Sequence, residues 1–264
     1  MSLKSKVFFF DIDGTIRSES DRYIPESTID AIKKLRLNGN KVFVNTGRTF
    51  SNIDEEIRSI GFDGYVCGCG TEIILNDKTF YHKVNSPELC RSIIDAVCDC
   101  GCVPIYERSD VLMTDRRAGT MPEMEELLQE CVNGGATAID VNDTDDICFD
   151  KFVIWFEDNM NIERFRRIIA NHFEYIDRGS NFAEMIPLDC NKASGMIRIL
   201  QEIGVELKNS IAFGDSLNDA AMLEAAGLGI AMGGSKPLYK YADYITKDLE
   251  MDGISYALKE YGFI

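Results

Sequence analysis

The sequence predicts an α/β fold with a parallel central sheet and a second domain inserted into the chain. The run Val7–Phe10 is apolar without alternation, which is typical of a strand covered on both faces. Apolar strands alternate with amphipathic helices near both ends of the chain, as in right-handed strand–helix–strand units. This rhythm changes at Lys83 and returns after Pro187. We therefore expect a core of residues 1–82 and 189–264, with residues 83–188 forming an inserted α/β domain.

The first part of the core is expected to contain three parallel strands and two crossover helices. Pro25 opens the first helix, its apolar residues recur at helical spacing, and Gly39 marks its end. The second helix is stopped by Gly61. The predicted order is strand 7–10, a helix from residue 25, strand 41–45, helix 51–60, strand 64–67 and a hairpin of residues 73–75 and 79–82.

The inserted domain is expected to fold around its own core, because it repeats a pattern of helix and short strands. The predicted order is helix 86–100, strands 103–106 and 111–114, helix 121–131, strand 152–156, helix 162–172, and strands near 175 and at 182–186. The last third of the chain returns to regular alternation. There we expect helix 192–203, strand 210–213, helix 220–226, strand 228–232, a short helix near Pro237, strand 244–246 and helix 253–261.

The charge balance argues against nucleic acid and anionic membranes as partners. Lys and Arg number 28 against 44 Asp and Glu, a formal net charge of -16. The same field repels a phosphorylated ligand, so phosphate chemistry would need local positive charge. The chain has nine cysteines and two histidines but no Cys-x-x-Cys pair, which favours reduced thiols over structural zinc. With no apolar leader before Asp11 and no stretch of spanning length, we expect a soluble cytoplasmic protein, as a monomer or weak homo-oligomer.

Polar residues follow three of the predicted strands where they end. These are Asp11 and Asp13, then Thr46, then Asp215, Asn218 and Asp219, while Lys192 opens the helix after the insertion. Ligands of open α/β sheets bind at the carboxyl ends of the strands, so we expect these groups to meet. Each has a plainer explanation: Asp11–Gly14 suits a polar turn, Lys192 a solvated first helical turn, and Asp215–Asp219 a helix cap.

These motifs together resemble the haloacid dehalogenase superfamily. Asp11–Thr15 matches its first motif, Thr46 the second, Lys192 the third and Gly214–Asp219 the fourth, in order along the chain. The large insertion before Lys192 further resembles the Cof-type sugar phosphatases, which have a Rossmann-like core and a cap domain. The resemblance implies an Mg²⁺-dependent phosphatase that hydrolyses small phosphomonoesters, with sugar phosphates favoured, through an aspartyl-phosphate.

The resemblance also implies roles for single residues. Asp11 would be the nucleophile, and Asp13 would protonate the leaving alcohol and then activate water. Mg²⁺ would bind the carboxylates of Asp11 and Asp215 and the main-chain carbonyl of Asp13. The phosphoryl oxygens would be held by Thr46, Gly47, Lys192 and Asn218. Asp219 would orient Lys192 or metal-bound water, and Arg48 would reach the substrate or make a surface ion pair.

Two residues depart from the subfamily pattern: Cys69 precedes Gly70 where Asn is usual, and Ala193 follows Lys192 where Gly is usual. Both leave the assigned chemistry intact. In the inserted domain, Tyr106, Arg108, Glu184 and Met185 are candidate pocket residues. Three other functions stay open: a phosphomutase, a catalytically silent phosphate-binding protein, and a signalling receiver that stores the phosphoryl group, although receivers are much shorter.

Overall fold

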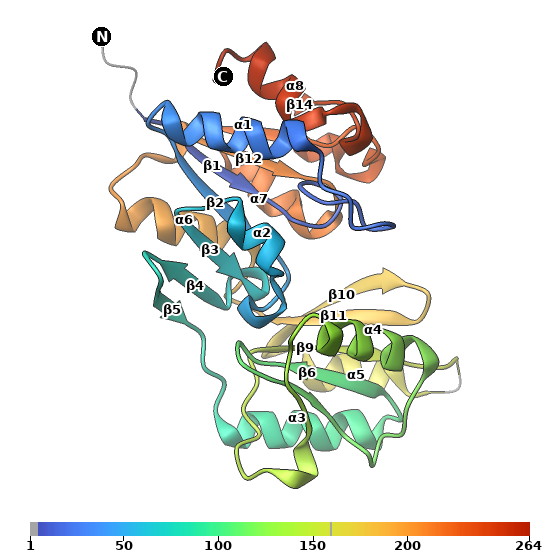
Figure 1. The fold of residues 1–264 in the computed structure, drawn as a ribbon. Coiled ribbons are helices and arrows are strands. Elements are labelled where there is room, and N and C mark those ends of the chain that lie inside the picture. Colours follow the sequence, from blue (N-terminus) through green and yellow to red (C-terminus); the bar gives the residue numbers. More distant parts are fainter. Residues whose placement is uncertain (1–4, 159) are drawn as a thin grey trace. The chain divides into compact units, whose positions relative to one another are not determined.

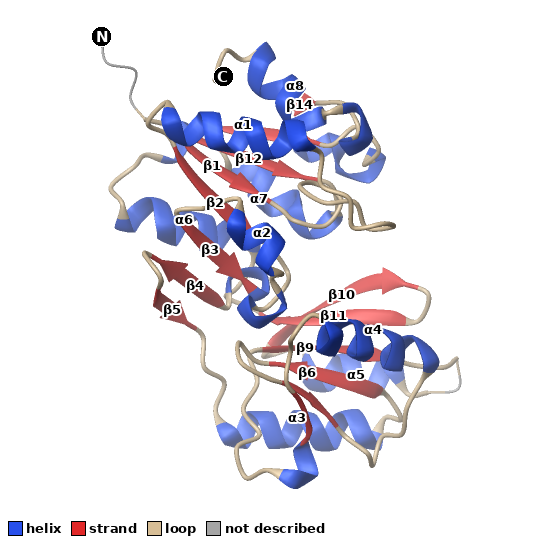
Figure 2. Ribbon diagram, in the orientation of Figure 1, coloured by secondary structure: helices blue, strands red, loops and turns tan. Residues whose placement is uncertain are grey.

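The computed structural model describes residues 5–158 and 160–264, which divide into two compact units. One unit comprises Met1–Gly47, Glu55–Tyr81 and Asn191–Ile264. The other comprises Arg48–Asp54 and His82–Cys190. Figures 1 and 2 show that each unit is a sheet with helices packed against it, which confirms the predicted α/β class.

The first unit is built on an eight-stranded sheet in the order β14-β13-β12-β1-β2-β3-β4-β5. All neighbouring pairs from β14 to β3 are parallel, and β4 is antiparallel to β3. The strands are β1 (Val7–Phe10), β2 (Lys41–Asn45), β3 (Gly64–Cys67), β4 (Glu72–Leu75), β5 (Lys78–His82), β12 (Ser210–Gly214), β13 (Leu228–Ala231) and β14 (Tyr244–Ile245). The central position of β1 explains why all four of its residues are buried.

Helices cover both faces of this sheet. They are α1 (Glu26–Leu37), α2 (Glu55–Ser59), α6 (Lys192–Glu202), α7 (Ala220–Ala225) and α8 (Gly253–Glu260). On one face, Val7 and Phe9 pack in a core that includes residues of α6 and α7, such as Met196. On the opposite face α1 lies beside α8, and the ring of Phe8 packs edge-on against Phe263. Alternate residues of β1 thus serve both cores, which is what an unalternating apolar run requires.

The predicted helix 51–60 is only partly helical. A 3₁₀ turn covers Phe50–Asn52, and α2 begins at Glu55 because Ile53 has extended backbone angles, with φ of -89° and ψ of 113°. This break coincides with the point where the chain passes between the two units. The short helix predicted near Pro237 is also 3₁₀, over Lys236–Tyr241.

The second unit has a six-stranded sheet in the order β10-β11-β9-β6-β7-β8. Its strands are β6 (Val103–Glu107), β7 (Leu112–Thr114), β8 (Ala138–Asp140), β9 (Lys151–Trp155), β10 (Phe173–Gly179) and β11 (Phe182–Pro187). Neighbours are antiparallel except β7 and β8. Helices α3 (Pro87–Asp99) and α5 (Ile162–Ile169) pack on one face, and α4 (Pro122–Asn133) packs on the other. The sequence did not predict β8, which is short and incompletely buried.

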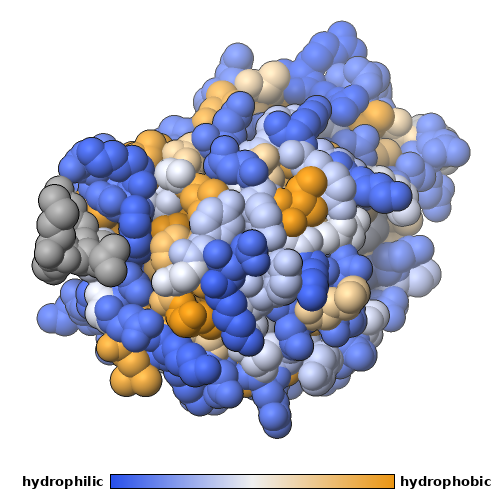
Figure 3. Space-filling view, turned by 90° about the horizontal axis from the view of Figure 1, so that it is seen from above, coloured by the Kyte–Doolittle hydropathy of each residue, from blue (hydrophilic) through white to orange (hydrophobic). Residues whose placement is uncertain are grey.

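All nine cysteines are free thiols. Burial raises the pKa of Cys90 and Cys102 to about 12, so these two remain protonated at neutral pH. None of the helices in the described residues is both long and apolar enough to cross a bilayer. Figure 3 shows one face of the molecule on which hydrophilic residues dominate and hydrophobic residues are scattered in small groups.

Candidate active site

The centre of the site is the side chain of Lys192, the first residue of α6. Its Nζ lies 2.8 Å from Asp11 Oδ1 and 2.6 Å from Asp219 Oδ1, and all three side chains are buried. Asn191 caps the helix, since its side chain accepts a hydrogen bond from the Ser194 amide. The main chain at Lys192 is also held, because Asn45 Nδ2 at the end of β2 donates to its carbonyl at 2.8 Å.

Asp11 and Asp215 complete a cluster of carboxylates with Asp219. Asp11 follows β1 and Asp215 follows β12, and these strands are parallel neighbours, so their carboxyl ends meet as the sequence predicted. One oxygen of each of the three carboxylates lies within 4.8 Å of the others. Asp215 is held by Thr15, whose Oγ1 donates to Oδ1 at 2.9 Å. Sequence reasoning gave Thr15 no role, although it belongs to the first motif.

Gly14 makes room for Asp215. The chain turns at Gly14 with φ of +78°, and a Cβ atom built there would lie 2.2 Å from Asp215 Oδ2. Glycine is therefore required twice, for the backbone angle and for the close approach of a carboxylate. A hollow of about 410 Å³ opens beside these residues and is lined by Gly14, Ser18, Glu19, Ser20, Asp215, Met232, Gly234, Ser235, Asp248, Leu249 and Glu250.

Asp219 already has partners on both oxygens. Oδ1 accepts from Lys192, while Oδ2 accepts from the amides of Asp215 and Ser216 at 3.0 and 3.1 Å. Among the described residues, Asp11 and Asp215 each retain a carboxylate oxygen for which the structure gives no hydrogen-bond donor. These two are therefore the better cation ligands, and Asp219 organises the loop around them.

The crowded carboxylates change each other's acidity. Burial and then the charge of Asp219 raise the pKa of Asp11 well above its usual range, although Lys192 opposes this. The same two causes raise the pKa of Asp215 to about 7. Burial alone would lower the pKa of Lys192, but Asp11 and Asp219 raise it above the ordinary value, so its ammonium stays charged. The site thus holds three carboxyl groups against one ammonium, and a hard divalent cation would favour the ionised form of the carboxyl groups.

The other predicted site residues occupy three different places. Thr46 is buried directly after β2, where its amide donates to the Val66 carbonyl, and Gly47 follows it as the last residue of that segment of the first unit. Asn218 Oδ1 accepts from Ser216 Oγ at 2.8 Å, within the Asp215–Asp219 loop. Arg48 belongs to the second unit and donates to the Asn52 carbonyl at 2.9 Å.

Asp13 lies beside a residue that sequence reasoning did not consider. Arg17 Nη2 is 3.0 Å from Asp13 Oδ1, and Arg17 is buried. The spacing of four residues would suggest a helical ion pair, but here it arises in a loop.

Of the four candidate pocket residues of the second unit, two lie in its core and two make ion pairs. Tyr106 and Met185 are completely buried in the core beneath α3 and α5. Arg108 pairs with Asp110 and Asp146. Glu184 is buried and pairs with Lys151 at 2.7 Å.

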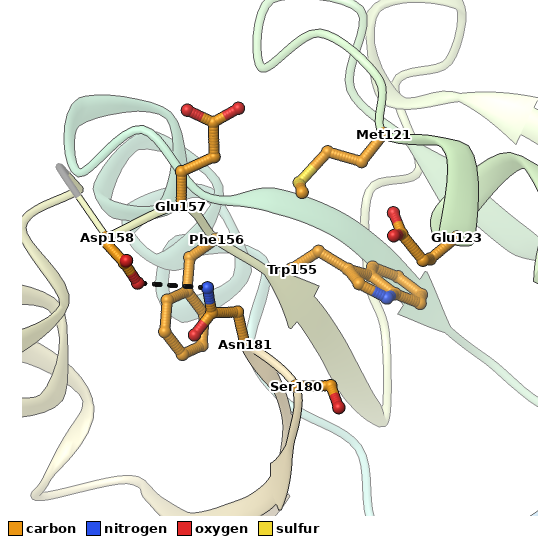
Figure 4. A pocket seen from close by; sticks show the side chains of 8 residues that line it. All are labelled: Met121, Glu123, Trp155, Phe156, Glu157, Asp158, Ser180 and Asn181. Atoms are coloured by element: carbon orange, nitrogen blue, oxygen red, sulfur yellow. Dashed lines mark hydrogen bonds between the residues drawn. The ribbon is translucent and has the colours of Figure 1, made fainter.

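The second unit has a hollow of about 470 Å³ that none of these four residues lines (Figure 4). Trp155 forms part of its wall, and Asn181 Nδ2 donates to Asp158 Oδ1 at 3.3 Å. Its lining residues are Met121, Glu123, Trp155, Phe156, Glu157, Asp158, Ser180 and Asn181. Three carboxylates and no cationic side chain line it, which makes it unsuitable for phosphate.

The chain is similar to known proteins along almost its whole length. A family model described as haloacid dehalogenase-like hydrolase matches residues 8–258. The chain is 27% identical to YkrA of Bacillus subtilis, covering 99% of this chain and 100% of YkrA. It is 26% identical to the 5-amino-6-(5-phospho-D-ribitylamino)uracil phosphatase YitU of the same organism, covering 99% of each. Among solved structures, BT1666 from Bacteroides thetaiotaomicron, a phosphatase of the same superfamily, aligns with a TM-score of 0.84 at 25% identity, covering 98% of this chain and 96% of that one.

Proposed function

The chain belongs to the haloacid dehalogenase-like hydrolases and is a phosphatase of that family. From the geometry of its site, we propose that it hydrolyses small phosphomonoesters through an aspartyl-phosphate on Asp11. The observation that carries this proposal is the buried Lys192 ammonium, which contacts Asp11 and Asp219 beside Asp215. A nucleophile, a fixed positive charge and a pair of cation ligands are the parts that phosphoryl transfer needs.

Asp11 is the proposed nucleophile. Lys192 holds Asp11 Oδ1 at 2.8 Å, which orients the carboxylate and favours its ionised form against the effect of burial. A carboxylate oxygen of Asp11 then attacks phosphorus, and one difficult hydrolysis becomes two displacements. Lys192 would next balance the charge that develops on the phosphoryl oxygens, and Thr46, the Gly47 amide and Asn218 would donate to the same oxygens.

The donor set fits Mg²⁺. Carboxylates of Asp11 and Asp215 with the main-chain carbonyl of Asp13 would hold it, and all three supply the hard oxygen ligands that this ion prefers. When bound, Mg²⁺ supplies positive charge to the phosphoryl oxygens. Asp219 acts through its hydrogen bonds, which position Lys192 and the Asp215 main chain.

Asp13 is the proposed acid and base. It would give a proton to the departing alcohol oxygen and then take one from the water that attacks the aspartyl-phosphate. Arg48 lies two residues after Thr46, and we propose that it contacts the part of the substrate beyond the phosphoryl group.

We propose sugar or polyol phosphates as the substrate class. The name of YitU gives its substrate a phosphate on a ribityl group, which supports a primary alkyl phosphate here. A net charge of -16 disfavours nucleic acid and anionic membranes as partners, and nine free thiols favour the reducing cytoplasm.

A phosphate-release screen tests the proposal. The panel is sugar phosphates, nucleotides, pyridoxal phosphate and flavin mononucleotide, each with Mg²⁺ and with excess chelator. We expect release that needs Mg²⁺ and that disappears in Asp11→Asn, while Asp63→Asn, which alters a carboxylate paired with Lys41, stays active. Full activity in chelator would reject the metal, and isomerisation of a hexose phosphate without free phosphate would reject hydrolysis in favour of a mutase.

A further inference from the structure

The loop that follows β1 brings a buried arginine against the proposed acid. Arg17 Nη2 lies 3.0 Å from Asp13 Oδ1, and the two side chains are 3% and 29% exposed. A guanidinium this deeply buried is costly unless it is paired, and it cannot lose its proton. The Arg17–Asp13 ion pair is therefore a fixed structural feature of the site.

Main-chain hydrogen bonds fix the pair in place. The amides of Ile16 and Arg17 both donate to the Ile12 carbonyl at 2.9 Å, and the Gly14 amide donates to the Arg17 carbonyl at 2.8 Å. The positive φ of Gly14 lets the chain fold back, so that the main chains of Asp13 and Arg17 pair in an isolated β-bridge. The guanidinium thus approaches Asp13 from a backbone that has little freedom.

This contact restricts the Asp13 carboxylate. A guanidinium is planar and directs its N–H groups along fixed lines, so it orients the carboxylate that it binds more strictly than an ammonium does. Because Arg17 donates to Oδ1, the carboxyl group of Asp13 is held in one orientation.

We propose that Arg17 is a positioning residue that acts through Asp13 and orients the Asp13 carboxyl group toward the departing oxygen. This inference rests on the acid–base role of Asp13 given above. In the first step, Asp11 forms a bond to phosphorus, the bond from phosphorus to the alcohol oxygen breaks, and that oxygen takes the proton from the Asp13 carboxyl group. In the second step, water attacks phosphorus, Asp13 recovers a proton from it, and Asp11 leaves as a carboxylate with free phosphate as product.

The test compares two leaving groups in single turnovers, followed by rapid quench. One substrate is the fastest sugar phosphate of the screen, whose alkoxide needs a proton, and the other is p-nitrophenyl phosphate, whose phenolate does not. A positioned acid contributes about 10²–10⁴-fold, so we expect Arg17→Met to slow alcohol release about tenfold and p-nitrophenolate release less than about twofold. Arg17→Lys keeps the positive charge but lacks the planar guanidinium. It should slow alcohol release from the sugar phosphate by less than Arg17→Met does, and it should leave p-nitrophenolate release unchanged.

A double-mutant cycle separates this inference from the proposed function. If Arg17 acts through Asp13, Arg17→Met should have almost no further effect in an Asp13→Asn background. Arg36→Met, which breaks a pair with Asp63 in the same unit, is the control and should leave both rates unchanged.

Several results would overturn the inference. Equal losses of both leaving groups in Arg17→Met, or the same loss with and without Asp13, would show that Arg17 acts elsewhere. If Arg17→Met does not fold, equal losses of both leaving groups in Arg17→Lys would overturn the inference instead. If Asp13→Asn itself slowed both leaving groups equally, the acid role of Asp13 would fail, and this inference with it.

Discussion

At the scale of single residues, the site depends on groups that are each held by more than one partner. Lys192 contacts two carboxylates through its ammonium while its carbonyl accepts from Asn45, and Asp219 joins Lys192 to the Asp215–Ser216 main chain. Such fixed charges stabilise a transition state without having to reorganise. A small displacement of any one of them should therefore cost activity.

Gly14→Ala tests this directly. The new Cβ would lie 2.2 Å from Asp215 Oδ2, so we expect Asp215 to move and phosphate release to fall by about 10²-fold or more. Gly39→Ala is the matched control, because Gly39 also has a positive φ, of +82°, but its Cβ would meet nothing within 4 Å. Backbone strain should cost each variant about 1 kcal/mol of stability, and Gly14→Ala should lose more because its Cβ displaces Asp215; urea unfolding measures both losses. Equal activity in the two variants would contradict the assigned role of the Gly14–Asp215 contact.

Some residue roles could be predicted from the sequence and others could not. Parallel strands end at one edge, so Asp11 and Asp215 could be expected to meet from the order of the strands alone. The Arg17–Asp13 pair depends on a loop that folds back at Gly14, and no periodicity describes such a loop. Tyr106 and Met185 were predicted to line a pocket but lie in the core of the second unit. The sequence of a strand that is buried on both faces does not show which side chains face that core.

At the scale of elements, α6 matters most because it carries Lys192 at its first residue and packs closely on β3. A Cβ atom at Gly195 would lie 2.3 Å from Val66 Cγ1, so the close approach of helix and strand needs a glycine in the helix. Boundaries of the regular elements followed from the sequence where apolar runs ended at glycines, as at Gly39 and Gly61. The break at Ile53 did not follow, because the chain there leaves one unit for the other.

Gly195→Ala should therefore be destabilising, although alanine normally favours a helix. Overpacking against Val66 should cost about 1–3 kcal/mol, and the shift of α6 should also slow phosphate release. Val66→Ala removes the clashing methyl group, so the double variant should be at least as stable as Val66→Ala alone. Urea unfolding of the three variants measures this. A stable, fully active Gly195→Ala variant would show that the packing of α6 on β3 is not critical.

At the scale of the whole molecule, the chain combines two units that each have a separate core. The family match spans residues 8–258 and so includes both units. The carboxylates, Lys192 and Arg17 all belong to one of them, and we propose that the other selects the substrate.

Exchanging residues 83–188 for the inserted domain of a related phosphatase should change the ranking of substrates. Because Asp11, Asp215 and Lys192 lie outside the exchanged segment, dependence on Mg²⁺ should be unchanged. Phosphate release across the same panel measures both properties. An unchanged ranking would count against an inserted domain that selects substrate.

The central claim, that Asp11 carries the phosphoryl group, is tested most directly by trapping it. The enzyme is quenched in acid during turnover with its fastest substrate, digested, and examined by mass spectrometry, with Asp11→Asn as the control. We expect the peptide containing Asp11 to gain the mass of one phosphoryl group, and hydroxylamine to remove it, as an acyl phosphate requires. A phosphoryl group on any other residue would contradict the account.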